Sequence, residues 1–186
     1  MYPFARLVSE LLRHRKAAPL PLTGIHVAHH ICWPWDIDMF MELNNGRTLT
    51  LYDLGRIVLF RRLGIMGAMR AQGWGGTVAG TSIRYRRRVR AFDRFELRTR
   101  LIGWDERFFY AEQSMWVRGE CASHGLLRLA LTDPLGLVPT ERVAAVLGAA
   151  PESPPLPGWV TAWIEAEAQR PWPPMRETGD GETIAA

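Results

Sequence analysis

The polar residues best placed for chemistry lie in one stretch, residues 33–64, where carboxylates and amides directly precede a long apolar segment. These residues are Asp36, Asp38, Glu42, Asn44 and Asn45. Either asparagine is a natural N-cap, because its short side-chain oxygen can accept a bond from a free amide one turn into a helix. Free amides at a helix N-terminus favour negative charge, and a carboxylate beside them can act as a general base or a nucleophile. The stretch therefore predicts a site that stabilises an oxyanion next to a carboxylate.

The segment that positions this polar cluster is a long helix. Between Leu49 and Leu63 apolar residues fall on nearly every side of a helical projection, and Gly64 follows as a stop signal. We therefore expect a helix that is buried on all sides. Asp53 and Arg56 are three residues apart on it, which predicts an internal ion pair that orients the helix or a substrate.

Size and composition are those of one soluble globular domain: 186 residues, 47% hydrophobic and 23% charged. The net charge of +4 comes almost entirely from arginine, and the densest cluster runs from Arg84 to Arg90. We expect a solvated edge there, with binding of substrate phosphates as the alternative. Nucleic-acid binding is disfavoured, because no aromatic-plus-basic motif of a known reader is present. Cys32 and Cys121 have no motif spacing, which predicts two free thiols and a cytoplasmic, reducing location.

The ends of the chain differ from its middle. Residues 1–16 predict an amphipathic helix, which we expect to pack on the domain; the alternative is a basic helix lying on a membrane surface. Residues 25–148 predict the main domain, residues 149–170 a proline-rich linker and a C-terminal helix, and residues 171–186 a disordered tail. No signal peptide or run of about 20 apolar residues is recognisable.

Residues 77–132 change to the two-residue period of β-strands, with turn signals between successive strands. Short turns predict antiparallel neighbours, and a further strand is expected at His26–Trp35. An apolar helix among such strands must be wrapped, and a curled antiparallel sheet can wrap it. The predicted class is therefore α+β, a long central helix enclosed by a curled antiparallel sheet, with extra N- and C-terminal helices.

Three histidines and a cysteine crowd the first of these strands: His26, His29, His30 and Cys32. A zinc site needs a second ligand cluster, and His124 is the one histidine farther along the chain. We therefore expect these histidines to be structural or exposed, and we expect no metal or redox cofactor.

The motif residues also resemble those of a known family. Asp36-x-Asp38, Asn44-Asn45-Gly46-Arg47 and Leu51-Tyr52-Asp53-Leu54-Gly55-Arg56 are similar to the hotdog-fold acyl-CoA thioesterases of the hydroxybenzoyl-CoA thioesterase type, in a bacterial thioesterase-like branch. The resemblance covers about residues 25 to 165, including the later strands. It implies a hotdog fold, a homodimer or dimer of dimers, and an active site between subunits.

The resemblance also implies residue roles. Asp38, the second aspartate of the pair, corresponds to the catalytic carboxylate, and the substrate carbonyl is expected over the start of the helix, at Asn44, Asn45, Gly46, Arg47 and Thr48. Glu42 stands where the family usually has histidine, and Thr48 where it usually has tyrosine. Glu42, Asp53 and Arg56 are possible accessory residues, and Arg86, Arg87 and Arg88 are candidates for the phosphates of coenzyme A.

Two functions follow from this reading. The first is an acyl-CoA thioesterase acting on an apolar fatty or aryl acyl group, with Asp38 as general base or nucleophile. The second, motivated by Glu42 and Thr48, is a non-catalytic hotdog protein that binds acyl thioesters or a protein partner. Contact of residues 1–16 with a membrane is compatible with either function.

Overall fold

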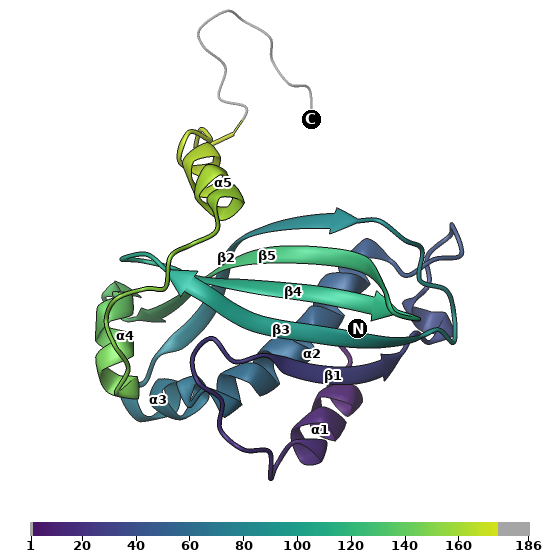
Figure 1. Cartoon of the computed structure of the whole chain (residues 1–186), viewed down its shortest axis with the longest axis horizontal. Coiled ribbons are helices and arrows are strands. Elements are labelled where there is room, and N and C mark those ends of the chain that lie inside the picture. Colours follow the sequence, from purple (N-terminus) through teal and green to yellow (C-terminus); the bar gives the residue numbers. More distant parts are fainter. Residues whose placement is uncertain (1, 175–186) are drawn as a thin grey trace, which may run out of the picture. The chain divides into compact units, whose positions relative to one another are not determined.

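A computed structural model describes residues 2–174 of the chain. Its elements follow one another in an α+β order, with one strand of the sheet before the long helix and the other strands after it (Figure 1). They are α1 (Phe4–Arg13), β1 (His26–Ile31), the 3₁₀ turn η1 (Pro34–Asp36), α2 (Asn45–Arg62), α3 (Ile65–Gln72), β2 (Gly75–Tyr85), β3 (Arg94–Trp104), β4 (Phe109–Val117), β5 (Glu120–Asp133), β6 (Gly136–Val138), α4 (Thr140–Leu147) and α5 (Gly158–Ala168).

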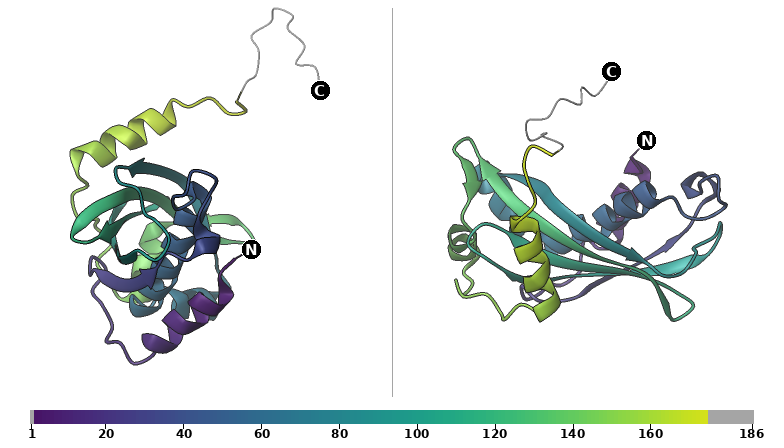
Figure 2. Two further views of the ribbon diagram at one scale, coloured as in Figure 1. Left: turned by 90° about the vertical axis from the view of Figure 1, so that its right-hand side faces the viewer. Right: turned by 90° about the horizontal axis from the view of Figure 1, so that it is seen from above.

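The strands form one antiparallel sheet in the order β1-β3-β4-β5-β2, with the short β6 added to β5. The sheet curls around α2, which lies against its concave face (Figures 1 and 2). This arrangement confirms the predicted hotdog fold. One pairing was predicted wrongly: β2 and β3 are successive in the chain but do not pair, because residues 86–93 carry the chain from one edge of the sheet towards the other.

Two strands end earlier than their residue pattern predicts, and one short strand was not predicted. β1 ends at Ile31 rather than Trp35, because Pro34 begins the 3₁₀ turn. β2 ends at Tyr85, and Val89 beyond it lies in the core instead of continuing the strand. The three-residue β6 has too few residues to show a two-residue period and was not predicted.

The α2 helix begins and ends close to the predicted residues, but it is not buried on all sides. Its sheet-facing side is buried, and Leu51, Leu54 and Val58 are fully covered. Leu49 remains 38% exposed, and Ile57 is only half-buried, on the side that looks towards β2. The described residues cover the apolar side chains on this side only in part.

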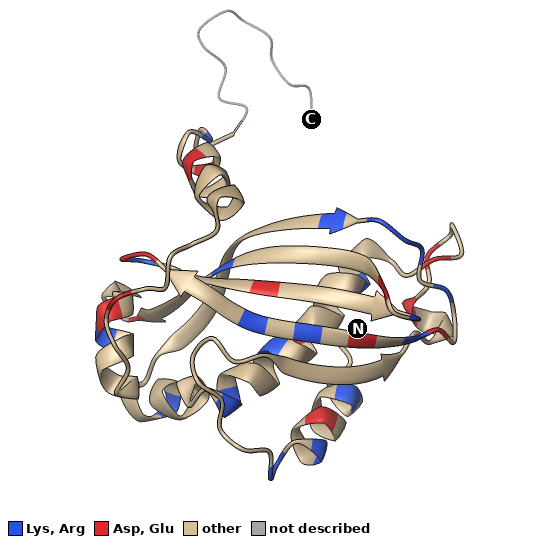
Figure 3. Ribbon diagram, in the orientation of Figure 1, with Lys and Arg blue, Asp and Glu red and all other residues tan. Residues whose placement is uncertain are grey.

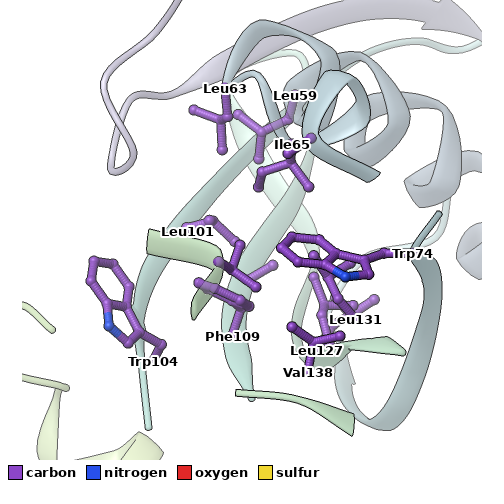
Figure 4. Close-up of a cluster of buried hydrophobic side chains, with 14 residues drawn as sticks. Leu59, Leu63, Ile65, Trp74, Leu101, Trp104, Phe109, Leu127, Leu131 and Val138 are labelled. Atoms are coloured by element: carbon purple, nitrogen blue, oxygen red, sulfur yellow. The ribbon is translucent and has the colours of Figure 1, made fainter. Parts of the chain in front are cut away.

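Two clusters of buried side chains fill the space between helix and sheet. One holds Leu59, Leu63, Trp74, Leu101 and Leu127 among others, and gathers where the end of α2 meets α3, β6 and α4 (Figure 4). The other lies around the first half of α2, with Tyr52, Leu97 and Met115. This second cluster forms the floor beneath the polar residues that precede α2.

The α1 helix lies beside β1, at the edge of the sheet opposite to β2 (Figure 1). It packs on the domain as expected, but its polar side makes much of the contact. Glu10 is buried, whereas Phe4, Val8 and Leu12 are 66%, 54% and 59% exposed. The expectation that the apolar side faces the domain is therefore wrong for these three residues.

The chain divides into a compact unit that ends at Pro155 and a second unit that begins at Leu156. The predicted C-terminal helix is present in the second unit as α5. Residues 175–186 of the predicted tail lie outside the described residues. None of the described helices is both long enough and apolar enough to cross a membrane.

Candidate active site

The site begins at the N-cap of α2. Asn44 has an extended backbone, and its side-chain oxygen accepts the amide hydrogen of Arg47 at 3.1 Å. Its backbone oxygen accepts bonds from the amide and the hydroxyl of Thr48, at 2.8 and 3.2 Å. Asn44 therefore acts as the predicted cap. The first-turn amides of Asn45 and Gly46 have no carbonyl within the helix to bond, so they remain available to an anion.

Asn45 lines a cavity of about 220 Å³, named here the amide cavity, and Gly46 follows it in the chain without being part of the lining. Its polar wall comes from Glu42, Asn45, Thr48 and the run Arg86–Arg88. Leu43, Val89 and Met115 supply apolar surface, and Tyr85 and Ser123 complete the lining. The structure thus brings the helix N-terminus, one carboxylate and three arginines to a single hollow.

Asp38 is not part of that lining. Its carboxylate accepts the amide hydrogen of Phe40 at 2.8 Å, and its backbone bonds Glu42 and Met41, so it holds a tight turn before α2. Met41 adopts a left-handed backbone with φ of 61° in the same turn. In this arrangement Glu42 reaches the cavity, whereas Asp38 stabilises the loop that carries Glu42.

Charged side chains that line the amide cavity form ion pairs. Glu42 accepts an ion pair from Arg88 at 3.0 Å, and Arg87 pairs with Glu120 at 2.9 Å. Both arginine side chains are more than half exposed, so these pairs contribute little stability and are easily exchanged. Arg86 has no side-chain partner among the described residues.

Asp36, the first aspartate of the Asp-x-Asp pair, is buried. Its carboxylate pairs with Arg6 at 2.6 Å and Arg47 at 3.2 Å, and it accepts the amide hydrogen of Trp33 at 2.9 Å. It therefore ties α1 and η1 to the first turn of α2. We expected Arg47 to position the substrate, whereas its side chain forms an ion pair with Asp36.

A buried hydroxyl pair lies under the cavity. The hydroxyls of Tyr52 and Ser123 are 2.9 Å apart, and both residues are buried. Burial raises the pKa of Tyr52 well above its ordinary value, which keeps it a neutral hydrogen-bonding group. No local pattern could have predicted this pair, because 71 positions separate the two residues in the chain.

The predicted Asp53–Arg56 ion pair is present and belongs to a larger network. Arg56 also donates to the side chain of Gln113 at 3.1 Å. Gln113 in turn donates to the backbone oxygen of Tyr52 and to the hydroxyl of Thr99, at 2.8 and 3.0 Å. The network fixes the middle of α2 against β3 and β4.

Gly55 shows how closely α2 approaches the sheet within this network. A Cβ added to it would lie 2.8 Å from the hydroxyl oxygen of Thr99, a distance that real Cβ contacts do not reach. The glycine of the Asp-Leu-Gly-Arg motif therefore sets the distance between helix and sheet.

A second hollow of about 230 Å³, the apolar cavity, opens farther along α2. Asp53 and Arg56 lie at its lining, which is otherwise mainly apolar, with Phe60, Met69 and Val78 among its residues. It is bounded by α2, α3, β2 and β5. Both cavities therefore open on the incompletely covered side of α2.

Among residues 2–174, no three histidine, cysteine or acidic side chains converge as metal ligands would. His26 is buried and its Nδ1 lies 3.2 Å from a nitrogen of Arg62. Burial lowers the pKa of His26 and of His30 to about 4. Burial also raises the pKa of Cys32 to about 11, so that thiol is a poor nucleophile at neutral pH.

A central helix wrapped by an antiparallel sheet, with free amides beside a carboxylate, defines a hotdog protein of the thioesterase class. The model of the Thioesterase-like superfamily matches residues 32–164, and the chain belongs to that superfamily.

The curated relatives include Protein THEM6 of Xenopus laevis, 34% identical over 140 residues, an alignment that covers 75% of this chain and 67% of that protein. Protein THEM6 of Danio rerio is 42% identical over 78 residues, covering 42% of this chain and 39% of that protein. The chain therefore spans about two thirds of the frog protein and well under half of the fish protein.

Solved structures share the fold at low sequence identity. The YbaW probable thioesterase of Escherichia coli has a TM-score of 0.59 and 17% identity, covering 65% of this chain and 95% of that one. The DHNA-CoA thioesterase of Staphylococcus aureus has a TM-score of 0.58 and 16% identity, covering 77% and 91%. A thioesterase of Thermus thermophilus complexed with coenzyme A and Zn has a TM-score of 0.55 and 21% identity, covering 63% and 90%.

Proposed function

We propose that this chain is an acyl-CoA thioesterase of the hydroxybenzoyl-CoA thioesterase type, acting on an apolar fatty or aryl acyl group. The observation that carries the proposal is the amide cavity, where the free N-terminus of α2 meets a carboxylate and three arginines. Membership of the superfamily supports thioester hydrolysis as the class of reaction.

The helix N-terminus supplies the electrostatic part of the reaction. The amides of Asn45 and Gly46 are positioned to stabilise the oxyanion that forms when the thioester carbonyl is attacked. A loop carboxylate takes a proton from the attacking water and returns it to the departing thiolate. Alternatively it attacks the carbonyl itself, the thiolate leaves and takes a proton from water, and a second water hydrolyses the mixed anhydride. The family resemblance favours Asp38 for this role, whereas the lining of the cavity favours Glu42.

The carrier and the acyl group have different surroundings. Arg86, Arg87 and Arg88 form the basic rim of the amide cavity and are suited to the phosphates of coenzyme A, a ligand present in the Thermus thermophilus structure. The apolar cavity farther along α2 is suited to a hydrocarbon or aromatic acyl group.

A second subunit would complete the site. β2 is an edge strand of 11 residues and most of its residues are exposed. A long exposed edge is a template for pairing with another strand. We propose that β2 and the incompletely covered side of α2 meet the same surfaces of a second copy, giving a homodimer or a dimer of dimers with the site between subunits.

The second candidate is a non-catalytic protein that binds acyl thioesters or a protein partner. The engagement of both carboxylates favours it: Glu42 is paired with Arg88, and Asp38 is bonded to the amide of Phe40. Such a protein would bind acyl-CoA without releasing its thiol.

The test is thiol release from a panel of acyl-CoAs by the wild type, Asp38→Asn and Glu42→Gln. A loss of kcat of about a hundredfold or more in one variant identifies the essential carboxylate, and loss in both makes them a working pair. Glu152→Gln, which removes an exposed carboxylate outside the lining of both cavities, is the matched control and should keep full activity. Binding of a non-hydrolysable acyl-CoA analogue, without turnover by the wild type, would replace the first function with the second.

A further inference from the structure

The feature that leads beyond the thioesterase site is the orientation of α1. Polar contacts hold its inner side: Arg61 donates to the backbone oxygens of Leu11 and His14 at 2.9 and 2.8 Å, and Arg13 donates to that of His29 at 3.3 Å. Arg6 adds its 2.6 Å ion pair with Asp36. A surface helix usually turns its apolar stripe to the core, but these contacts fix α1 with an apolar stripe towards solvent.

That outer stripe consists of Phe4, Val8 and Leu12, which follow one another at four-residue intervals and are each more than half exposed. Arg15 and Lys16 are exposed just beyond the end of the helix. Glu10 is the one acidic residue between positions 2 and 16, and it is buried against Arg13 and His14. The outward surface of this segment is therefore apolar and cationic, with no negative charge.

A basic hollow of about 670 Å³, the outer cavity, adjoins this helix. It is lined from α1, β1, β3 and β4, and its arginines are Arg6, Arg13, Arg94, Arg98 and Arg118. Figure 3 shows basic residues of α1 and of β3 on the same side of the molecule. The cavity is separate from the amide cavity and shares no lining residue with it.

Part of this positive charge is uncompensated. Arg98 pairs with Glu96 and stacks 4.5 Å over the ring of Trp116, and Arg118 pairs with Asp93 at 3.0 Å. Arg94 is exposed and has no side-chain partner among the described residues. One guanidinium nitrogen of Arg6, Nη1, is buried without a hydrogen-bond partner. The charge of Arg6 is balanced by Asp36, so exposed Arg94 is the cavity cation best placed to take an anionic ligand.

We propose that α1 and the outer cavity together bind the surface of an anionic phospholipid membrane, the stripe entering the lipid and the cavity holding phosphate headgroups. An anionic membrane has negatively charged headgroups above a hydrocarbon layer. The apolar stripe is suited to the hydrocarbon, and the exposed arginine and lysine are suited to the headgroups. The polar anchoring of α1 keeps the stripe facing outward, so the surface is formed before any lipid arrives.

The first experiment is co-sedimentation of the full chain with vesicles of phosphatidylcholine, with and without phosphatidylglycerol. Binding is expected only to the anionic vesicles, and Val8→Glu is expected to weaken it about tenfold or more, because a carboxylate replaces a buried apolar contact. Leu135→Glu is the matched control, since Leu135 is 96% exposed in the β5–β6 turn, and it should bind as the wild type does.

The second arm separates headgroups from free phosphate. Arg94→Ala should weaken binding to anionic vesicles, whereas Arg70→Ala, which removes an exposed arginine on α3, should not. Titration with inorganic phosphate is the parallel measurement. If phosphate binds the wild type and Val8→Glu equally well while neither binds vesicles, the cavity serves a soluble phosphate and the membrane proposal is wrong.

A protein partner for the stripe gives a different result. If Val8→Glu changes the mass of the assembly in light scattering, Phe4, Val8 and Leu12 contact another copy of the chain, and the proposal is overturned. Unchanged mass together with lost vesicle binding supports the lipid surface. Thiol release from soluble acyl-CoA should be the same in Val8→Glu and wild type, so failure of this proposal remains distinct from failure of the proposed enzyme.

Discussion

The two edges of the sheet are treated in opposite ways. At β1 the chain covers its own edge with α1, held by Arg6, Arg13 and Arg61 through ion pairs and bonds to backbone oxygens. At β2 nothing in the described part of the chain pairs with the outer edge, and the neighbouring side of α2 keeps apolar residues exposed.

An exposed strand edge invites association, and proteins usually block the edges they do not use. The β1 edge is closed within the subunit, whereas the β2 edge is the surface that we propose meets a second copy. Contacts at the first edge should determine the stability of the subunit, and contacts at the second should determine its assembly.

The largest loss of folding stability is expected from Asp36→Asn. The change leaves Arg6 and Arg47 near a neutral group in a buried place, and breaking a buried pair typically costs about 3–5 kcal/mol. Urea denaturation at pH 7 and at a fixed protein concentration measures this loss in the free energy of unfolding. Glu120→Gln breaks an exposed pair and should cost less than about 1 kcal/mol. Equal losses in the two variants would show that Asp36 does not hold the covered edge.

The next largest loss of folding stability is expected from Arg61→Ala. It removes the donors to the backbone oxygens of Leu11 and His14, and the free energy of unfolding should fall by about 1.5–3 kcal/mol. Hydrogen exchange should rise in α1 before it rises elsewhere. Arg70→Ala, on an exposed face of α3, should change stability by no more than about 0.5 kcal/mol.

The open edge is tested by Val78→Lys. Val78 is 43% exposed on β2, and a symmetric pairing would bring the two new charges to one interface. The dissociation constant of the dimer should rise about tenfold or more, with little change in subunit stability. Light scattering measures the mass, and Leu135→Lys serves as the control. A monomeric wild type would contradict the assignment of β2 to assembly.

The smallest effect on folding stability near neutral pH is expected from the buried histidines, which change it only as the pH falls. Burial lowers the pKa of His26 and His30 to about 4, below the ordinary 6.5, so the unfolded chain binds more protons between these values. Stability should therefore fall as pH falls from 6.5 to 4. Glu10, whose pKa burial raises, acts in the opposite direction near the acidic end. The melting temperature of His30→Phe should depend less on pH than that of the wild type.

Features that depend on neighbouring residues could be predicted from the sequence. The cap at Asn44 and the Asp53–Arg56 pair each follow from residues within one helical turn, and the structure has both. The strands followed from their two-residue period. The order of strands in the sheet did not follow from this period, because β2 pairs with β5 and not with β3, the strand that follows it in the chain.

The parts of the site that were missed depend on distant positions. The Tyr52–Ser123 pair, the contacts of Gln113 and the burial of Asp36 by Arg6 all join segments that only the folded sheet brings together. Glu42 was predicted as a possible accessory residue, at a position where it departs from the family motif. Its place on the cavity wall depends on the turn held by Asp38, a geometry that residue types alone do not specify.

The close approach of Gly55 to Thr99 has a consequence for how this chain can change in evolution. Any side chain at position 55 would meet the hydroxyl of Thr99, which also bonds Gln113. A larger residue at 55 therefore requires the Thr99 hydroxyl to move or to be removed, and either change disturbs the bond that Gln113 donates to it. The three positions should vary together among descendants of this sequence, or not at all.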